Sequence, residues 1–188
     1  MLNLARQSIK IPSHISAKLD GDVLFLNGPL AEATIDLRVF IFINADKTKI
    51  TISDKLLPSS VGNQKLEGKA LQGSTFALIR QNISGIAGGF RKQLHLVGVG
   101  YRASTESKET HQILSLKLGY SHKVELMVPA CLKIVCLKPT VISVYGQDKH
   151  EVSQMAAIIK SYRFPEPYKG KGILYQDEKI LRKEGKRS

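Results

Sequence analysis

The sequence has no tryptophan and only two cysteines, and aromatic side chains make up only 6% of its 188 residues. A core must therefore come mainly from Ile, Leu, Val and Ala, which favours small β-rich layers with helices on one face. Cys131 and Cys136 lie five positions apart in a strand-like run, so they should face opposite sides and form no disulfide with each other. Neither has a Cys or His neighbour at zinc-finger spacing, so both are expected to be small buried core residues in a reducing compartment.

Long apolar runs are also missing. The run Val39 to Ile43, which no other apolar run exceeds, has the length of a strand and is far shorter than the roughly 18 to 20 residues of a membrane span. A strand pattern begins within about ten residues of Met1, which leaves no room for a secretory signal or a long transit peptide. We therefore expect a soluble protein with no membrane partner, either made where it works or already freed of a leader.

Residue patterns typical of catalysis, metal binding or nucleotide binding are absent. No two histidines stand at i, i+4 on an expected helix, and none has a carboxylate at a catalytic spacing. The stretch Gly62–Ala70 has five residues between its glycines instead of the four of a P-loop, and Ala70 replaces the magnesium-binding hydroxyl. Gly98 and Gly100 lack the third glycine of a dinucleotide fingerprint, and a bulge inside a strand explains them better. No enzyme, cofactor, metal or small-molecule substrate is expected.

Positive charge is the most prominent property that the chain does have. Its 28 Lys and Arg exceed its 16 Asp and Glu, which gives a formal net charge of +12. Such a surplus suggests a polyanionic partner, although a basic but inert surface is the alternative. Net charge is +3 over residues 1–90, +4 over 91–159 and +5 over 160–188. The last 29 residues are therefore the candidate contact surface.

Apolar periodicity predicts a first module of short strands followed by a helix. The helix is expected over residues 66–84, with Phe76, Ile79, Ile83 and Ile86 on one stripe, and with Gly85, Gly88 and Gly89 ending it. The strands are expected at residues 9–11, 15–19, 23–27, 33–43 and 49–53.

A second module repeats this plan. Its helix should begin after Asp148, a plausible N-cap with Glu151 three residues later, and should bury Val152, Met155, Ala156 and Ile159. The strands are expected at residues 90–104, 112–118, 123–128, 132–137 and 141–145.

An internal repeat connects the two modules. Residues 11–28 and 128–146 each contain a proline turn, a strand, a second turn and a strand that ends in glycine, with a drift of one residue. Each module then reaches a helix, the first after an additional hairpin. Chance similarity between two hairpins is the alternative reading.

The pattern changes from Phe164 onward. Two prolines and two glycines between residues 164 and 172 exclude a helix or a central strand and predict an extended, partly rigid segment. The remainder has too little apolar content for a core of its own and needs a surface to lie on. Tyr168 and Tyr175 could pack on sugars or bases, whereas a disordered basic tail is the alternative. The candidate phosphate-binding cations are Arg163, Lys169, Lys171, Lys179, Arg182, Lys183, Lys186 and Arg187.

Five segments, in order, give the chain a specific resemblance to a known family. They are Ala70–Thr75, Leu94–Ala103, Leu118–His122, Pro165–Ile173 and Arg182–Lys186. With them the chain resembles bacterial-type large-subunit ribosomal protein L6 over essentially its whole length. The resemblance implies two domains of common ancestry. It also implies binding to large-subunit rRNA near the sarcin–ricin loop, where translation factors dock, beside neighbouring ribosomal proteins.

The same resemblance assigns RNA contacts to named positions. It places them at Tyr168, Lys169, Gly170, Lys171, Gly172, Arg182, Lys183 and Lys186, and Tyr101 and Arg102 of the segment Leu94–Ala103 are further RNA-binding candidates. Phe76, Phe164 and Leu174 depart from basic residues that are usual in the family. Residues 136–139, Cys-Leu-Lys-Pro, look more like mitochondrial members, so the matrix of the mitochondrion is the expected location, with the bacterial cytoplasm or a plastid as alternatives.

Taken together, these observations predict an α+β protein of two repeated domains, each a small antiparallel sheet packed with one helix, plus a basic C-terminal extension. The expected boundaries are 1–89, 90–162 and 163–188. The expected function is that of a structural constituent of the large ribosomal subunit that binds rRNA. The alternatives are an RNA-binding adaptor outside the ribosome or, less favoured, an RNA-processing enzyme.

Overall fold

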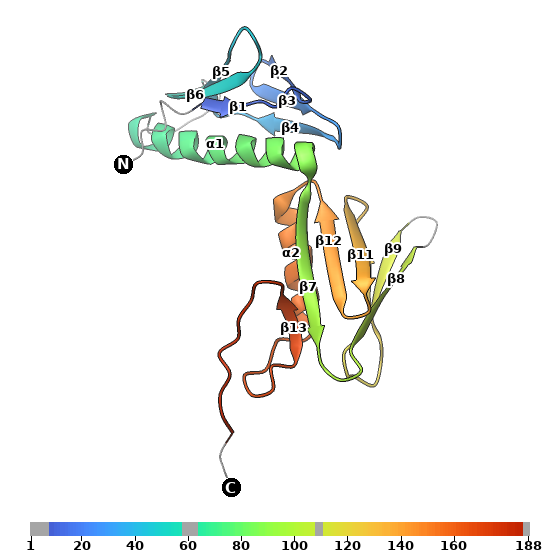
Figure 1. The fold of residues 1–188 in the computed structure, drawn as a ribbon. Helices are drawn as coiled ribbons and strands as arrows, with labels where there is room; N and C mark the ends of the chain where they lie inside the picture. Colours follow the sequence, from blue (N-terminus) through green and yellow to red (C-terminus); the bar gives the residue numbers. More distant parts are fainter. Residues whose placement is uncertain (1–7, 58–63, 108–110, 186–188) are drawn as a thin grey trace. The chain divides into compact units, whose positions relative to one another are not determined.

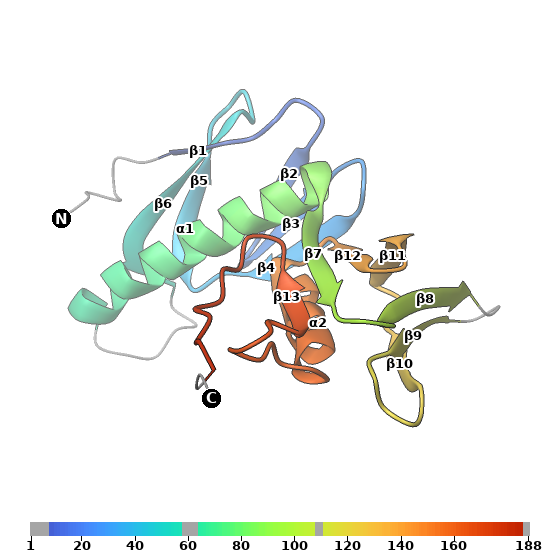
Figure 2. The same ribbon diagram turned by 60° about the horizontal axis from the view of Figure 1, so that its bottom comes forward.

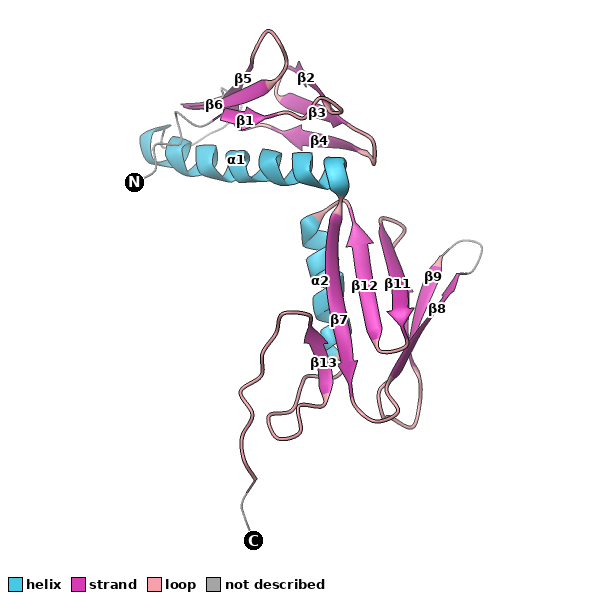
Figure 3. Ribbon diagram, viewed as in Figure 1, coloured by secondary structure: helices cyan, strands magenta, loops and turns pink. Residues whose placement is uncertain are grey.

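The computed structural model describes residues 8–57, 64–107 and 111–185, and the chain divides into two compact units, 1–89 and 90–188 (Figure 1). Within these described residues, each unit combines one α-helix with small antiparallel sheets (Figure 3), which confirms the α+β class. In the described part of the chain, neither helix has the length and apolar character needed to cross a membrane.

The first unit contains two three-stranded sheets that share one helix. One sheet has the order β1-β6-β5 and the other β2-β3-β4. The helix α1 (Gln64–Gly88) lies along both sheets (Figure 2) and buries Ile79, Ile83 and Ile86 in their common core, as the apolar stripe predicted. The strands are β1 (Ser8–Lys10), β2 (Ser16–Asp20), β3 (Val23–Asn27), β4 (Glu32–Asp36), β5 (Val39–Ile43) and β6 (Lys49–Leu56).

Two sequence predictions for this unit were wrong. The strand expected over 33–43 is interrupted at Leu37, whose N–H donates to the Asp22 carbonyl at 2.8 Å, and the chain changes sheet there. The helix also continues through Gly85. Ile86 is completely buried, and burying a large apolar side chain outweighs the helix cost of one glycine, about 1 kcal/mol. Gly89, with φ +70°, follows the helix.

The second unit contains a four-stranded sheet, β11-β12-β7-β13, and a three-stranded sheet, β10-β9-β8. The helix α2 (Lys149–Ser161) packs on β7 and β12 and buries Val152, Met155, Ala156 and Ile159, as predicted. The Asp148 carboxylate caps it by accepting from the His150 N–H at 2.8 Å. The strands are β7 (Phe90–Val97), β8 (Arg102–Ser107), β9 (Gln112–Lys117), β10 (Val124–Val128), β11 (Leu132–Lys138), β12 (Val141–Gly146) and β13 (Gly172–Tyr175).

Gly98 and Gly100 form a turn and not a bulge within one long strand. The turn separates β7 from β8, which lie in different sheets. It requires glycine, because Gly100 has φ +76° and a Cβ at Gly98 would lie 2.8 Å from the Tyr101 ring. The cysteine prediction also needs correction: both thiols are free, as expected, but Cys131 is exposed and Cys136 is half-buried.

The internal repeat is confirmed in its backbone geometry. The Ile15 N–H donates to the Pro12 carbonyl at 3.0 Å, and the Leu132 N–H donates to the Pro129 carbonyl at the same distance. The strands that follow also pair alike, β2 with β3 and β11 with β12. In both units a glycine lies at the end of the second strand, and the helix approaches this glycine closely. A Cβ at Gly28 would meet Ile86 of α1 at 2.3 Å, and one at Gly146 would meet Val152 of α2 at 2.8 Å.

Candidate nucleic-acid interface

The basic C-terminal segment is part of the second unit. It was expected as an extension beyond residue 162, but β13 pairs antiparallel with β7 and forms an edge of the four-stranded sheet. Ile173 is completely buried in the core of this unit. The surface that the segment was predicted to need is therefore the edge of its own sheet.

The residues between α2 and β13 form a closed loop. The Ile173 N–H donates to the Arg163 carbonyl and the Glu166 N–H to the Lys171 carbonyl, both at 2.9 Å. Gly172 has φ +148°, and a Cβ there would lie 2.5 Å from the Pro165 Cα, so the loop closes only around glycine. This loop presents an exposed Tyr168 and is not a disordered tail.

A polar cluster anchors the chain just after β13. The Glu178 carboxylate accepts from the Lys160 ammonium at 2.6 and 2.7 Å and from the Tyr175 N–H at 3.1 Å. The hydrogen bond from Lys160 lowers the pKa of Glu178 below its ordinary value. The ammonium groups of Lys160 and Lys92 lie 4.8 and 5.3 Å from the centroid of the Tyr175 ring. Tyr175 is thus engaged within the protein, and its packing on RNA stays a prediction.

The chain then returns along the loop and brings two basic stretches together. The Lys183 N–H donates to the Pro167 carbonyl at 2.9 Å. The Arg182 guanidinium lies 3.4 Å from the position that a Cβ at Gly170 would occupy. Lys169 and Lys171 of the loop therefore share one surface with residues more than ten positions later in the sequence. We call residues 163–185 the basic segment.

The other predicted site residues have different positions. Arg102 and Lys179 are exposed, whereas Gly170 and Gly172 are buried and shape the backbone. Tyr101 is only 6% exposed, so its ring belongs to the core and is not available as a contact surface. Lys186 and Arg187 lie outside the described residues.

Tyr120 is a residue of this surface that the sequence predictions did not include among the contacts. Its hydroxyl donates to the Tyr162 carbonyl at 3.0 Å, and its ring lies 5.0 Å from the Arg163 guanidinium carbon. It belongs to Leu118–His122, one of the motifs that carried the resemblance, and this was the signal in the sequence that could have identified Tyr120 as a functional residue. Only the fold brings it beside Arg163, because the two lie 43 positions apart in the sequence.

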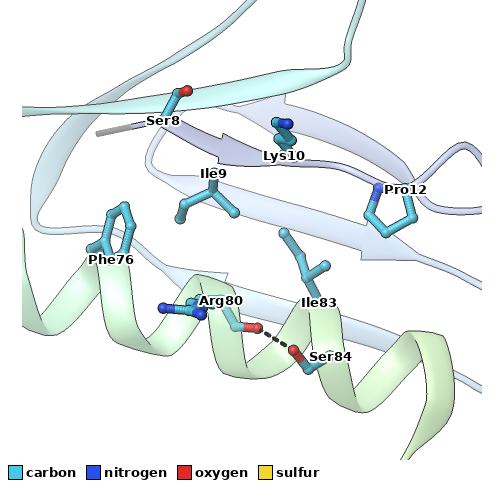
Figure 4. A pocket seen from close by; sticks show the side chains of 8 residues that line it. All are labelled: Ser8, Ile9, Lys10, Pro12, Phe76, Arg80, Ile83 and Ser84. Carbon is cyan, nitrogen blue, oxygen red and sulfur yellow. Dashed lines mark hydrogen bonds between the residues drawn. The ribbon is translucent and has the colours of Figure 1, made fainter. Parts of the chain in front are cut away.

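The three departures from the family pattern have distinct environments. Phe164 is 66% exposed, and Leu174 is half-buried on β13. Phe76 is half-buried and packs against the core of the first unit. It also lines a groove of about 460 Å³ between β1 and α1 (Figure 4). The groove is lined by Ser8, Ile9, Lys10, Pro12, Phe76, Arg80, Ile83 and Ser84.

The side chains that could bind a metal ion are spread over the described part of the fold. Among the residues that the structure describes, no group of three or more His, Cys, Asp or Glu could hold a metal ion. Of the P-loop-like stretch, Gly62 lies outside the described residues, and the part from Gln64 onward is helical.

Comparison with known proteins gives a consistent assignment. Residues 97–176 match the family described as ribosomal protein L6. The large ribosomal subunit protein uL6 of Paramagnetospirillum magneticum is 37% identical over 187 residues, which cover 100% of this chain and 99% of the relative. The proteins of the same name from Mycoplasmoides gallisepticum and Pelotomaculum thermopropionicum are 38% and 39% identical over 186 residues, with 97% and 96% of each relative covered. These relatives are bacterial, which supports the bacterial alternative for location over the mitochondrial one. With the repeat, the two-unit fold and a match over its whole length, the chain belongs to the ribosomal protein L6 family.

Proposed function

We propose that this protein is a structural constituent of the large ribosomal subunit and that its basic segment binds large-subunit rRNA. Membership of the L6 family, whose members are structural proteins, means that the chain is not an enzyme. The relatives are named as proteins of the large ribosomal subunit, which supports the same assembly for this chain.

The observation that carries the RNA-binding proposal is the folding of the basic segment onto itself. Lys183 is tied to Pro167 by a backbone hydrogen bond, and Arg182 covers Gly170. The chain thereby concentrates exposed cations on a preformed surface, so that little conformational entropy is lost when RNA binds. Phosphate contacts supply affinity, and the shape of the folded RNA supplies specificity.

A more specific location for this contact follows from the family resemblance. We place the contact near the sarcin–ricin loop, in the region where translation factors dock, with other large-subunit proteins as neighbours. The bacterial origin of the relatives supports a bacterial ribosome as the assembly. A mitochondrial location stays a prediction from residues 136–139, and cell fractionation of the source organism tests it.

Salt dependence of binding tests the electrostatic mechanism. Log affinity for a large-subunit rRNA transcript should fall steeply and linearly with log salt, because each neutralised phosphate releases condensed counterions. Filter binding across a potassium chloride series measures the slope. A slope near zero would contradict phosphate binding.

Co-sedimentation tests the assembly and separates the two alternatives. The tagged full-length protein should sediment with large subunits through a sucrose gradient. A free RNA-binding adaptor would remain at the top of the gradient. An RNA-processing enzyme would alter rRNA on incubation with magnesium or a methyl donor, and we expect no turnover.

Truncation after Tyr162 is a poor test of the same proposal. It would remove β13 and leave the core without the fully buried Ile173. A loss of binding would then report unfolding as much as lost contacts. Charge substitutions on exposed residues of the basic segment avoid this ambiguity.

A further inference from the structure

Tyr120 and Arg163 form a contact to which the family resemblance assigned no role. Tyr120 lies in the turn between β9 and β10, and Arg163 follows the end of α2. The Tyr120 hydroxyl donates to the Tyr162 carbonyl at 3.0 Å and so fixes the turn to the peptide immediately before Arg163. The guanidinium carbon of Arg163 lies 5.0 Å from the centroid of the Tyr120 ring, within the range of a cation–π contact.

The backbone of Arg163 is held from both sides. Its N–H donates to the Lys160 carbonyl at 3.2 Å, and its carbonyl accepts from the Ile173 N–H at 2.9 Å. The Tyr120 ring itself stacks with His122, at 5.9 Å between centroids and 17° between planes. Backbone and side chain of Arg163 are therefore both restrained, although the residue is exposed.

The charge of Arg163 remains available. Its pKa is raised above the ordinary value, chiefly by a hydrogen bond with the Tyr120 hydroxyl and then by the proximity of Tyr101. In the described part of the chain, no ion pair joins Arg163 to a carboxylate, whereas Lys160, three residues earlier, is paired with Glu178 at 2.6 Å. Of these two cations at the end of α2, only Arg163 is thus poised for an external anion.

We propose that Tyr120 is a positioning residue that holds the Arg163 guanidinium ready to bind a phosphate of the RNA backbone. The inference rests on the proposed function and names the ligand of one part of that surface. A guanidinium has five N–H donors, so Arg163 can contact the Tyr120 ring and hydroxyl and still offer donors for paired hydrogen bonds to phosphate oxygens. Because the arginine is already restrained, it loses less rotamer entropy on binding than a free surface arginine would.

A double-mutant cycle in the full-length protein tests this coupling. Wild type, Tyr120→Leu, Arg163→Ala and the double variant are titrated with an in vitro transcribed large-subunit rRNA over a salt series. We expect each single change to weaken binding about tenfold, as for loss of a charge-assisted hydrogen bond. The double variant should lose no more than either single variant, because both remove the same contact. Arg163→Ala should also reduce the salt slope by about one.

Tyr120→Phe supplies the finer control. It retains the ring under Arg163 but removes the hydroxyl, so a loss of about threefold is expected, between wild type and Tyr120→Leu. If urea unfolding shows that Tyr120→Leu is not folded, the rRNA affinity of Tyr120→Phe tests the proposal in its place. An affinity of Tyr120→Phe equal to that of wild type would then overturn the proposal. Lys18→Ala, an exposed cation on β2 in the first unit, should leave binding unchanged.

The outcomes separate this inference from the proposed function. If wild type prefers the transcript no more than it prefers transfer RNA, the proposed function fails. If wild type binds specifically but Tyr120→Leu binds equally well, or if the two losses add to about a hundredfold, the positioning role of Tyr120 fails alone.

Discussion

The hairpin β2–β3 of the first unit continues into β4, whereas the hairpin β11–β12 of the second is extended through β7 to β13. Both hairpins open with the same proline turn and approach their helix at a glycine. Their surroundings differ: residues 1–89 have a net charge of +3 and residues 90–188 of +9. One repeated scaffold thus carries a nearly neutral surface in one unit and a cationic surface in the other.

The contrast lies in charge and not in exposed apolar side chains, since Phe42 of the first unit and Phe164 of the second are 62% and 66% exposed. The second unit adds the basic segment, which is closed by hydrogen bonds and carries its cations outward. The scaffold fixes the core, and the segment added at the sheet edge fixes what the surface can bind.

Gly172→Ala should have the largest effect and should damage only the second unit. Its Cβ would lie 2.5 Å from the Pro165 Cα and 2.8 Å from the Phe164 carbonyl oxygen, and backbone atoms cannot move aside easily. We expect a loss of about 3 kcal/mol or more in the free energy of unfolding, measured in urea, with weaker rRNA binding. Gly185→Ala is the matched control, because nothing lies within 4 Å of its Cβ position. Wild-type stability in Gly172→Ala would contradict the loop geometry.

Removing three cations from each unit compares the two surfaces directly. The triple change Lys169→Ala, Lys171→Ala, Lys183→Ala should weaken rRNA binding about a hundredfold and reduce the salt slope by about three, because these side chains are expected to contact phosphates. The same number of changes in the first unit, Lys10→Ala, Lys18→Ala and Lys49→Ala, should alter affinity by less than about twofold. Equal losses of rRNA affinity in the two triple variants, measured by filter binding, would show that the net charge of the protein alone determines affinity, whatever its location.

The repeat predicts matched costs for Gly28→Ala and Gly146→Ala. The added methyl group would meet Ile86 at 2.3 Å in the first unit, and Leu132 at 2.5 Å and Val152 at 2.8 Å in the second. These neighbours are ends of flexible side chains, so we expect about 2 kcal/mol of destabilisation in each case. Urea unfolding measures both values. A large loss of unfolding free energy in one unit and none in the other would mean that the close approach of the helix requires glycine in only one unit.

Glu178→Gln should have the smallest effect and should depend on pH. The carboxylate has a pKa lowered from 4.5 by Lys160, so it stabilises the fold above that pH, and the contribution is lost as the pH falls through the folded pKa. Because the pair is partly exposed, we expect a loss of about 1 kcal/mol or less at neutral pH, and this loss should shrink as the pH falls through the folded pKa. Unfolding curves over a series of acidic to neutral pH values test this. A difference that persists in acid would exclude the ion pair as its cause.

Much of the local structure could be predicted from the sequence. The apolar stripes of both helices, the Asp148 cap and the repeated proline turns follow from short-range rules of periodicity and capping. The candidate cations were also identifiable, because charge density along the chain requires no knowledge of contacts. Predictions that failed concern long-range choices: the break at Leu37, the turn at Gly98 and Gly100, and the helix through Gly85.

The sequence by itself determined the α+β class, the duplicated hairpin and the cationic end of the chain, since each depends on the types of residues that lie a few positions apart. The tertiary structure alone decided that β13 joins the sheet of the second unit, that Tyr101 is buried, and that Tyr120 supports Arg163. The physical reason is separation along the chain. Burial and cation–π contacts depend on which distant segments meet, and only the packed core brings them together.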